Sequence, residues 1–66
     1  MNNPRFNKGD LVSAKLWEDN AVYIPGVAEV IDIYPTREGT DFIYVCKHND
    51  ITYYCRANQI YLYEPY

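Results

Sequence analysis

Residues 41–56 read DFIYVCKHNDITYYCR, and this stretch decides the fold. Residues 41–48 and 52–56 are rich in β-branched and aromatic side chains, which favour strands. The intervening residues 49–51 begin with Asn and Asp, two residue types that favour tight turns. Two strand-like runs joined by such a short turn predict a β-hairpin.

The rest of the chain repeats the same alternation of strands and turns. Apolar residues with helical spacing and caps at both ends are absent, so no α-helix is expected. Residues 57–59 are too short for a helix but suit one 3₁₀ turn. Further strands are expected at residues 11–17, at residues 22–34 with an interruption at Pro25-Gly26, and at residues 60–63. Five short strands with a single turn before the last predict an all-β fold, a small five-stranded SH3-like barrel.

Alternation within these strands predicts which side chains share a face. Val12, Ala14 and Leu16 line one face of the first strand, and Trp17 lies on the other. Proline cannot donate to a sheet ladder, so Pro25-Gly26 predicts a bulge or an edge.

Tyrosines near the C-terminus follow the same rule. Tyr61 and Tyr63 share one face of the last strand, with Ile60 and Leu62 on the other, and Tyr66, which follows the strand, is grouped with the tyrosine face. This pattern predicts either a plain tyrosine outer face or an adhesive stripe for a partner or a second copy. Of the neighbours Tyr53 and Tyr54, one is expected in the core and one on the surface.

The chain length allows one small domain. A chain of 66 residues buries only about 60% of its unfolded surface, so its core is thin and must use large side chains. Eight tyrosines, two phenylalanines and one tryptophan supply them. We assign residues 1–8 to a polar lead-in, with Phe6 as a possible anchor, and residues 9–64 to the barrel; a complete small protein and an excised domain both remain open.

The charge pattern limits the classes of molecule that the protein is expected to bind. The formal net charge is −3 and the six cations are scattered, which argues against a nucleic-acid binder. No apolar run approaches the ~20 residues of a membrane span. The start Met1-Asn-Asn-Pro lacks the features of a signal peptide, so an intracellular location, cytoplasmic or nuclear, is expected.

Residues with catalytic or metal-binding chemistry are too few to predict an enzyme. Zinc would need four ligands, whereas the candidates are Cys46, Cys55 and His48. No nucleophile has a recognisable base, and no glycine-rich phosphate loop is present. A hairpin turning about Asp50-Ile51 would place Cys46 directly opposite Cys55, which permits a disulfide under oxidation; free buried thiols are the default expectation. The chain is expected to be non-catalytic, with no cofactor.

Short motifs in the first half of the chain resemble a Tudor domain, and the resemblance extends over roughly residues 8–63. Such domains have a Gly-Asp turn, an alanine four residues later, an acidic loop tip, and then an aromatic residue and a small residue. The matching residues here are Lys8-Gly9-Asp10, Ala14, Glu18-Asp19-Asn20, Tyr23 and Pro25-Gly26-Val27.

The Tudor resemblance implies a cage of aromatic rings that holds a methylated lysine or arginine by cation–π attraction. Tyr23 stands where the family has one cage wall. The wall from the first strand falls on Leu16, one residue before Trp17, and a shift of one residue turns a strand side chain to the opposite face. The wall from the third strand falls near Lys47 or His48. The residues assigned to the barrel mouth are Trp17, Tyr23, Tyr44, His48, Asp50 and Tyr53.

Two functions follow from these features. The first is an interaction module, or adaptor, that docks a peptide or protein, methylated or not, at the aromatic mouth. The alternative is a small bacterial or phage accessory protein of the same fold. It would bind or inhibit a protein complex, or self-associate, through the tyrosine face of Tyr61 and Tyr63.

Overall fold

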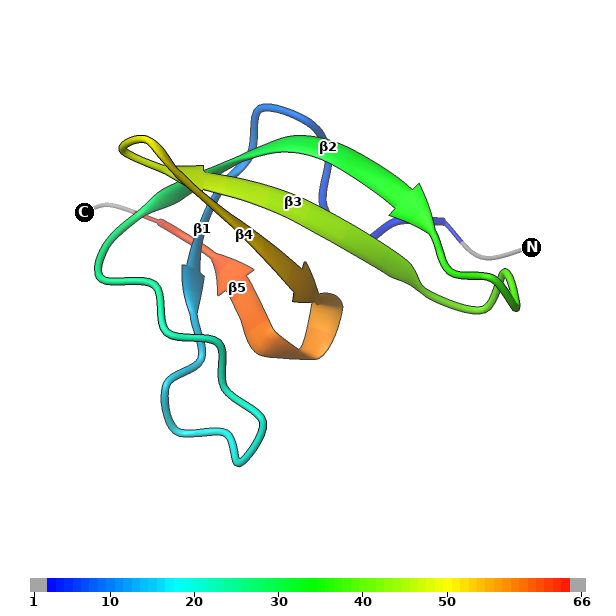
Figure 1. The fold of residues 1–66 in the computed structure, drawn as a ribbon, viewed down its shortest axis with the longest axis horizontal. Helices are drawn as coiled ribbons and strands as arrows, with labels where there is room; N and C mark the ends of the chain where they lie inside the picture. The colour runs from blue at the N-terminus through cyan, green and yellow to red at the C-terminus, as the bar shows by residue number, and fades with distance from the viewer. Residues whose placement is uncertain (1–2, 65–66) are drawn as a thin grey trace.

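The computed structural model describes residues 3–64 and is an all-β structure (Figure 1). A single 3₁₀ turn, η1, precedes the last strand, as the sequence predicted. The elements are β1 (Leu11–Ala14), β2 (Ala28–Pro35), β3 (Phe42–His48), β4 (Ile51–Arg56), η1 (Ala57–Gln59) and β5 (Ile60–Leu62). The all-β class, the five strands and the late turn are therefore confirmed.

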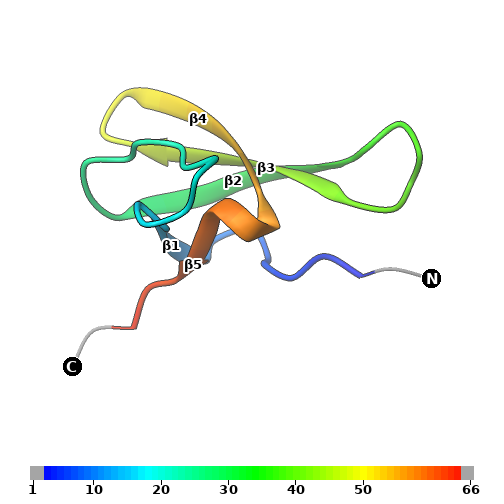
Figure 2. The same cartoon turned by 90° about the horizontal axis from the view of Figure 1, so that it is seen from below.

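All five strands form one antiparallel sheet in the order β4-β3-β2-β1-β5. Within residues 3–64, β4 and β5 are the two edges, so the hydrogen-bonded ladder is open and does not close into a continuous barrel. The loop between β2 and β3 projects at the end of the molecule where the N-terminus emerges (Figures 1 and 2). The turn between β3 and β4 lies at the opposite end, so the two ends of the β2–β4 meander carry different loops.

The long second strand contains a β-bulge. Val30 pairs with Cys46 and Asp32 with Val45, so Ile31 is an extra residue in β2. A bulge of this kind bends a strand and resets its alternation. As a result Val30 is buried on one side of the bulge, and Ile33 packs against the core on the other. The strand begins at Ala28 and not near residue 22, because Pro25-Gly26 forms a bend before it.

The β3–β4 hairpin is tighter than the sequence predicted. His48 pairs with Ile51, which leaves Asn49 and Asp50 as a two-residue connection, and Asn49 adopts a left-handed φ of 55° that Asn tolerates. Cys46 therefore lies opposite Tyr53 and not opposite Cys55.

The prediction that Cys46 lies directly opposite Cys55 was wrong, because the strand register differs from the one expected. Cys55 lies opposite Tyr44, so the two cysteines are diagonal neighbours on one face, and diagonal pairs are roughly 7–8 Å apart. Both are buried free thiols, as the default expectation had it.

The first strand is shorter than predicted. It ends at Ala14, and the chain turns at once, with the Leu16 N–H donating to the Ala14 carbonyl at 3.1 Å and the Glu18 N–H to Lys15 at 3.1 Å. Leu16 is exposed and does not share the buried face of Val12 and Ala14. Strand alternation therefore does not fix the direction of Trp17.

The core lies on the inner face of the bent sheet and includes the N-terminal arm, residues 3–8. Phe6 is 7% exposed and contacts Tyr44 edge to face, with ring centroids 5.2 Å apart. The lead-in is thus part of the folded unit. The buried core residues are Phe6, Val12, Ala14, Ile24, Ala28, Val30, Tyr44, Cys46, Cys55 and Ile60.

Candidate functional site

An aromatic surface covers the outer face of β1 and β5. Val12 and Ala14 point into the core, so Leu11 and Ser13 point outward. Ser13 pairs with Tyr61, and the Tyr63 N–H donates to the Leu11 carbonyl at 2.8 Å, which continues the ladder. The aromatic surface, as the term is used below, consists of Leu11, Trp17, Tyr61 and Tyr63.

Trp17 is the most exposed member of this surface. Its ring contacts Tyr61 with centroids 5.6 Å apart and planes tilted by 35°, while 69% of the residue remains exposed. A side chain this large usually buries 150–250 Å² in a core or an interface. Trp17 is thus held by one neighbour and open on its other side.

The turn η1 holds the loop that carries Trp17. The Lys15 N–H donates to the Gln59 carbonyl at 2.8 Å, and the Gln59 side-chain amide donates to the Asn20 carbonyl at 2.6 Å. The Ala21 N–H closes the loop tip on Glu18 at 3.2 Å. These bonds fix both arms of residues 15–21 against η1, directly before the strand that carries Tyr61.

The returning part of the same loop is fixed by His48. Its Nδ1 lies 2.8 Å from the Val27 carbonyl, and its ring lies directly over Gly26. A Cβ at residue 26 would be 2.7 Å from His48 Cε1, so the ring occupies the space that any other residue would need. His48 therefore positions the loop and is partly shielded by it.

The residues assigned to one mouth are distributed over the molecule. Tyr23 is 69% exposed in the β1–β2 loop, and Asp50 is exposed at the hairpin turn. Tyr53 is half-buried and packs against the core. Tyr44 is 1% exposed and lies roughly 13 Å along β3 from His48, toward the other end of the strand. The four rings Trp17, Tyr23, Tyr44 and Tyr53 make no ring contact with one another among the described residues; Trp17 contacts Tyr61 instead.

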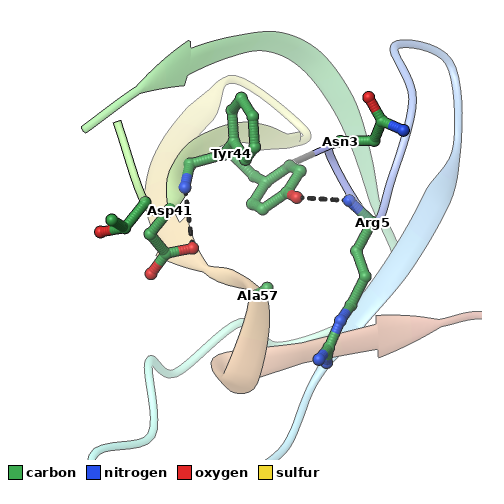
Figure 3. A pocket seen from close by; sticks show the side chains of 7 residues that line it. Asn3, Arg5, Asp41, Tyr44 and Ala57 are labelled. Atoms are coloured by element: carbon green, nitrogen blue, oxygen red, sulfur yellow. Dashed lines mark hydrogen bonds between the residues drawn. The ribbon is translucent and has the colours of Figure 1, made fainter. Parts of the chain in front are cut away.

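The sequence analysis missed a cleft at the end of the molecule where the N-terminal arm passes the β2–β3 loop (Figure 3). Its volume is about 300 Å³. The N-terminal arm forms one wall, which no local pattern in the sequence indicates, because the partner strand lies 39 residues away. The lining residues of this N-terminal cleft are Asn3, Arg5, Thr40, Asp41, Phe42, Tyr44 and Ala57.

Hydrogen bonds fix both walls of the N-terminal cleft. The Arg5 N–H donates to the Tyr44 hydroxyl at 2.8 Å, which ties the arm to β3. On the other wall, Asp41 Oδ1 accepts from the Phe42 N–H at 2.7 Å and Asp41 Oδ2 lies 3.4 Å from Arg56 Nη1. Both oxygens of the Asp41 carboxylate are thus engaged.

The outer face of β2–β4 carries a second group of apolar side chains. Val45 is only 6% exposed although it lies outside the main core. Its cross-strand neighbours are Asp32 and Tyr54, and Tyr54 is exposed, as one of Tyr53 and Tyr54 was predicted to be.

A polar group borders this second patch. The Tyr34 hydroxyl donates to Asp32 Oδ2 at 2.7 Å, and Lys8 lies 3.4 Å from Asp32 Oδ1. The Tyr34 hydrogen bond, with help from the Ile33 N–H and Lys8, lowers the pKa of Asp32. The same carboxylate raises the pKa of Tyr34.

The two thiols are unsuited to nucleophilic chemistry. Cys46 and Cys55 are both buried, which keeps reagents and metal ions from them; their mutual hydrogen bond raises the pKa of Cys46 and lowers that of Cys55. A thiol must ionise to act as a nucleophile or metal ligand.

No family model, curated protein or solved structure matches the chain. No helix within residues 3–64 is long and apolar enough to cross a membrane. What the protein does must therefore be inferred from its own side chains.

Proposed function

We propose that this chain is a non-catalytic interaction module that binds a peptide or protein partner across the aromatic surface of β1 and β5. The observation that supports this most directly is Trp17, which is 69% exposed while its position is fixed by Tyr61. Tryptophan and tyrosine are enriched among the residues that dominate binding energies. A pre-positioned ring loses little entropy on binding, which favours recognition over chance exposure.

The side chains beside Trp17 favour a cationic group on the partner. Glu18 and Asp19 follow it directly in the same exposed loop tip. A cation over the face of a tryptophan is attracted by the ring, by roughly 0.5–1 kcal/mol at an exposed site and about 2 when desolvated. Because Trp17 and Tyr61 already contact each other, the ligand would approach the open side of Trp17 and not a gap between the two rings.

A methylated lysine or arginine is the form of this ligand that the Tudor resemblance implies. In that case Trp17 supplies one wall, and Tyr23, exposed in the same loop, is the proposed second wall. Tyr44 and Tyr53 do not take part, because both pack against the core. The proposed site is therefore an open platform on the β1–β2 loop with fewer walls than the mouth predicted from the sequence.

The fluorescence of Trp17, the single tryptophan of the chain, offers a direct test. Peptides that carry a trimethyllysine, a dimethylarginine, an unmodified lysine or a neutral leucine at one position are titrated into the protein. We expect the cationic peptides to shift the emission and the leucine peptide to leave it unchanged. Equal response to all four peptides, or no response at millimolar concentration, would refute the cationic ligand.

Two variants locate the binding on the surface. Tyr61→Ala removes the neighbour of Trp17 and is expected to weaken peptide binding, which is measured from amide NMR shifts. Tyr54→Ala is the control, because Tyr54 is also an exposed tyrosine but lies on the outer face of β4. Equal loss of binding in both variants would contradict the assignment to β1 and β5.

A second candidate is self-association or the binding of a protein complex through the tyrosine face. The supporting observation is that Tyr61 and Tyr63 do share the outer face with Leu11, so exposed apolar side chains are contiguous there. Sedimentation velocity over a range of concentrations tests this. A monomer at all concentrations would exclude self-association and leave the binding of another protein as the surviving form of this candidate.

A further inference from the structure

We propose that the N-terminal cleft is a second binding site, separate from the aromatic surface, and that it binds a carboxylate group carried on a compact apolar body. The ligand is either a small organic acid or the side chain of an acidic residue in a peptide. Three observations lead to this ligand class: a hydroxyl donor on the wall, an arginine without an ion partner among residues 3–64, and a volume that admits a small organic body.

The hydroxyl donor belongs to Tyr44. Its oxygen accepts the Arg5 N–H at 2.8 Å, but its own O–H proton meets no acceptor among residues 3–64. Tyr44 is 1% exposed and lines the cleft, so an acceptor for this proton has to come from the cleft itself. An acceptor atom in the cleft would satisfy this proton, so the wall favours a ligand with an oxygen at that point.

Arg5 adds a positive charge on the same wall. Its backbone N–H is engaged, but its guanidinium has no ion pair with any residue in the range 3–64. Figure 3 shows the Arg5 side chain running from the arm toward Ala57, along the side of the cleft. A guanidinium presents paired donors that match the two oxygens of a carboxylate.

The one carboxylate in the cleft does not oppose an anion strongly. Asp41 uses one oxygen to accept the Phe42 N–H and the other to face Arg56, so its charge is already compensated. Asn3 also lines the cleft, opposite Asp41, and its side-chain amide carries both a donor and an acceptor. Arg5 is therefore the lining residue whose charge has no ion partner among residues 3–64, and its positive charge suits an anion.

The lining residues and the volume of the cleft determine which anions fit it best. Phe42 and Ala57 supply apolar surface beside Tyr44. The volume of about 300 Å³ is at the lower limit for small-molecule sites, which run from about 300 to 1,000 Å³. The exposed lining of the cleft is mostly polar, but a bare inorganic anion would fill only a small part of this volume, whereas a carboxylate on a small ring or a short aliphatic stem would fill more of it.

The test is an NMR titration of the full chain with four probes. Benzoate and an acetylated, amidated glutamate peptide carry the carboxylate on a small molecule and on a peptide, respectively. Benzamide is the neutral isostere of benzoate, and inorganic phosphate is an anion without an apolar body. We expect benzoate or the peptide, or both, to shift the amide signals of Arg5, Phe42, Tyr44 and Ala57. The one that binds more tightly identifies the source of the carboxylate.

Arg5→Gln removes the charge but keeps the backbone N–H that binds Tyr44, so the fold should persist. It is expected to weaken carboxylate binding about tenfold or more, because hydrogen bonds to a charged group are worth roughly 1.5–3 kcal/mol. Arg37→Gln removes an equal charge from the exposed loop outside the cleft and is expected to change affinity by less than about twofold, since surface charges act weakly at a distance.

Four results would overturn the proposal. They are the absence of shifts at millimolar probe, benzamide binding as well as benzoate, phosphate binding as well as benzoate, and equal losses in the Arg5 and Arg37 variants. None of these readouts involves Trp17, so the test of this cleft is independent of the test of the proposed cation-binding platform.

Discussion

Substituting Gly26 by alanine is expected to destabilise the fold through a single neighbour, His48. Gly26 does not have a left-handed φ, so alanine brings no backbone strain and the cost comes from space alone. The new Cβ would lie 2.7 Å from His48 Cε1 and 3.4 Å from both ring nitrogens. Carbon atoms pack at about 3.5–4.0 Å, so the ring must retreat by roughly 1 Å.

That retreat acts on a hydrogen bond as well as on packing. His48 Nδ1 lies 2.8 Å from the Val27 carbonyl, and moving the ring lengthens this bond beyond a useful distance. Overpacking costs about 1–3 kcal/mol and a lost hydrogen bond about 1. We expect Gly26→Ala to lower the free energy of unfolding by about 2 kcal/mol, out of a total of roughly 3–10 for a domain of this size.

Urea unfolding of a double-mutant cycle measures this effect. The cycle comprises Gly26→Ala, His48→Ala and the double variant. Once the ring is gone, Gly26→Ala should be neutral, or stabilising by about 0.4–1 kcal/mol because alanine restricts the unfolded chain. The expected coupling between residues 26 and 48 is therefore about 2 kcal/mol or more. Additivity of the two single changes within about 0.5 kcal/mol would refute the assignment of the clash to His48.

Three further outcomes follow from the structure. Phe6→Ala should lower the free energy of unfolding, measured by urea titration, by about 3–5 kcal/mol, and Phe6→Leu by less than about 1.5 kcal/mol. A loss below about 1 kcal/mol for the alanine variant would show that the arm is not part of the core. In an NMR pH titration, Asp32 should have a pKa below its ordinary value of about 3.9, and Tyr34→Phe should raise it. Because the folded pKa is lowered, this stabilisation is present at neutral pH and is lost as the pH falls through that pKa; an unchanged pKa in the variant would contradict the hydrogen bond as the cause. Cys46 and Cys55 should react with a thiol reagent in the native protein only at the rate of unfolding, and rapid modification without denaturant would contradict their burial.

Local chemistry allowed most of the strands to be predicted. β3 and β4 carry β-branched and aromatic residues next to turn formers, and the structure places them within one residue of the expected bounds. The late 3₁₀ turn at Ala57–Gln59 was likewise predictable, since the segment is too short for an α-helix.

The errors come from backbone geometry that a single sequence does not specify. The cysteine register depended on whether two or three residues form the hairpin turn, and the left-handed conformation of Asn49 selects two. The length of β1 depended on where the chain turns, and the hydrogen bonds after Ala14 end it early.

The site depends on tertiary contacts, which is why it was only partly predictable. Trp17 was assigned to the barrel mouth and is exposed, but its neighbour Tyr61 is 44 residues later and was assigned to a different surface. The N-terminal cleft requires the arm to cross β3 at Tyr44, and nothing in residues 1–8 predicts that crossing. The periodicity of a sequence does not show which distant segments lie next to each other in the fold.

The docking of the N-terminal arm also has a consequence for dynamics. The arm is held by the burial of Phe6, by one hydrogen bond from Arg5 to Tyr44 and by the exposed ion pair of Lys8 with Asp32, with no strand pairing of its own within residues 3–8. A segment held by so few contacts detaches at a lower free energy than the whole domain unfolds. The Arg5 amide should therefore exchange its hydrogen faster than the amides of β3, and each detachment removes one wall of the cleft. A ligand in the cleft would slow that exchange, so hydrogen exchange at one amide reports both the motion of the arm and the occupancy of the site.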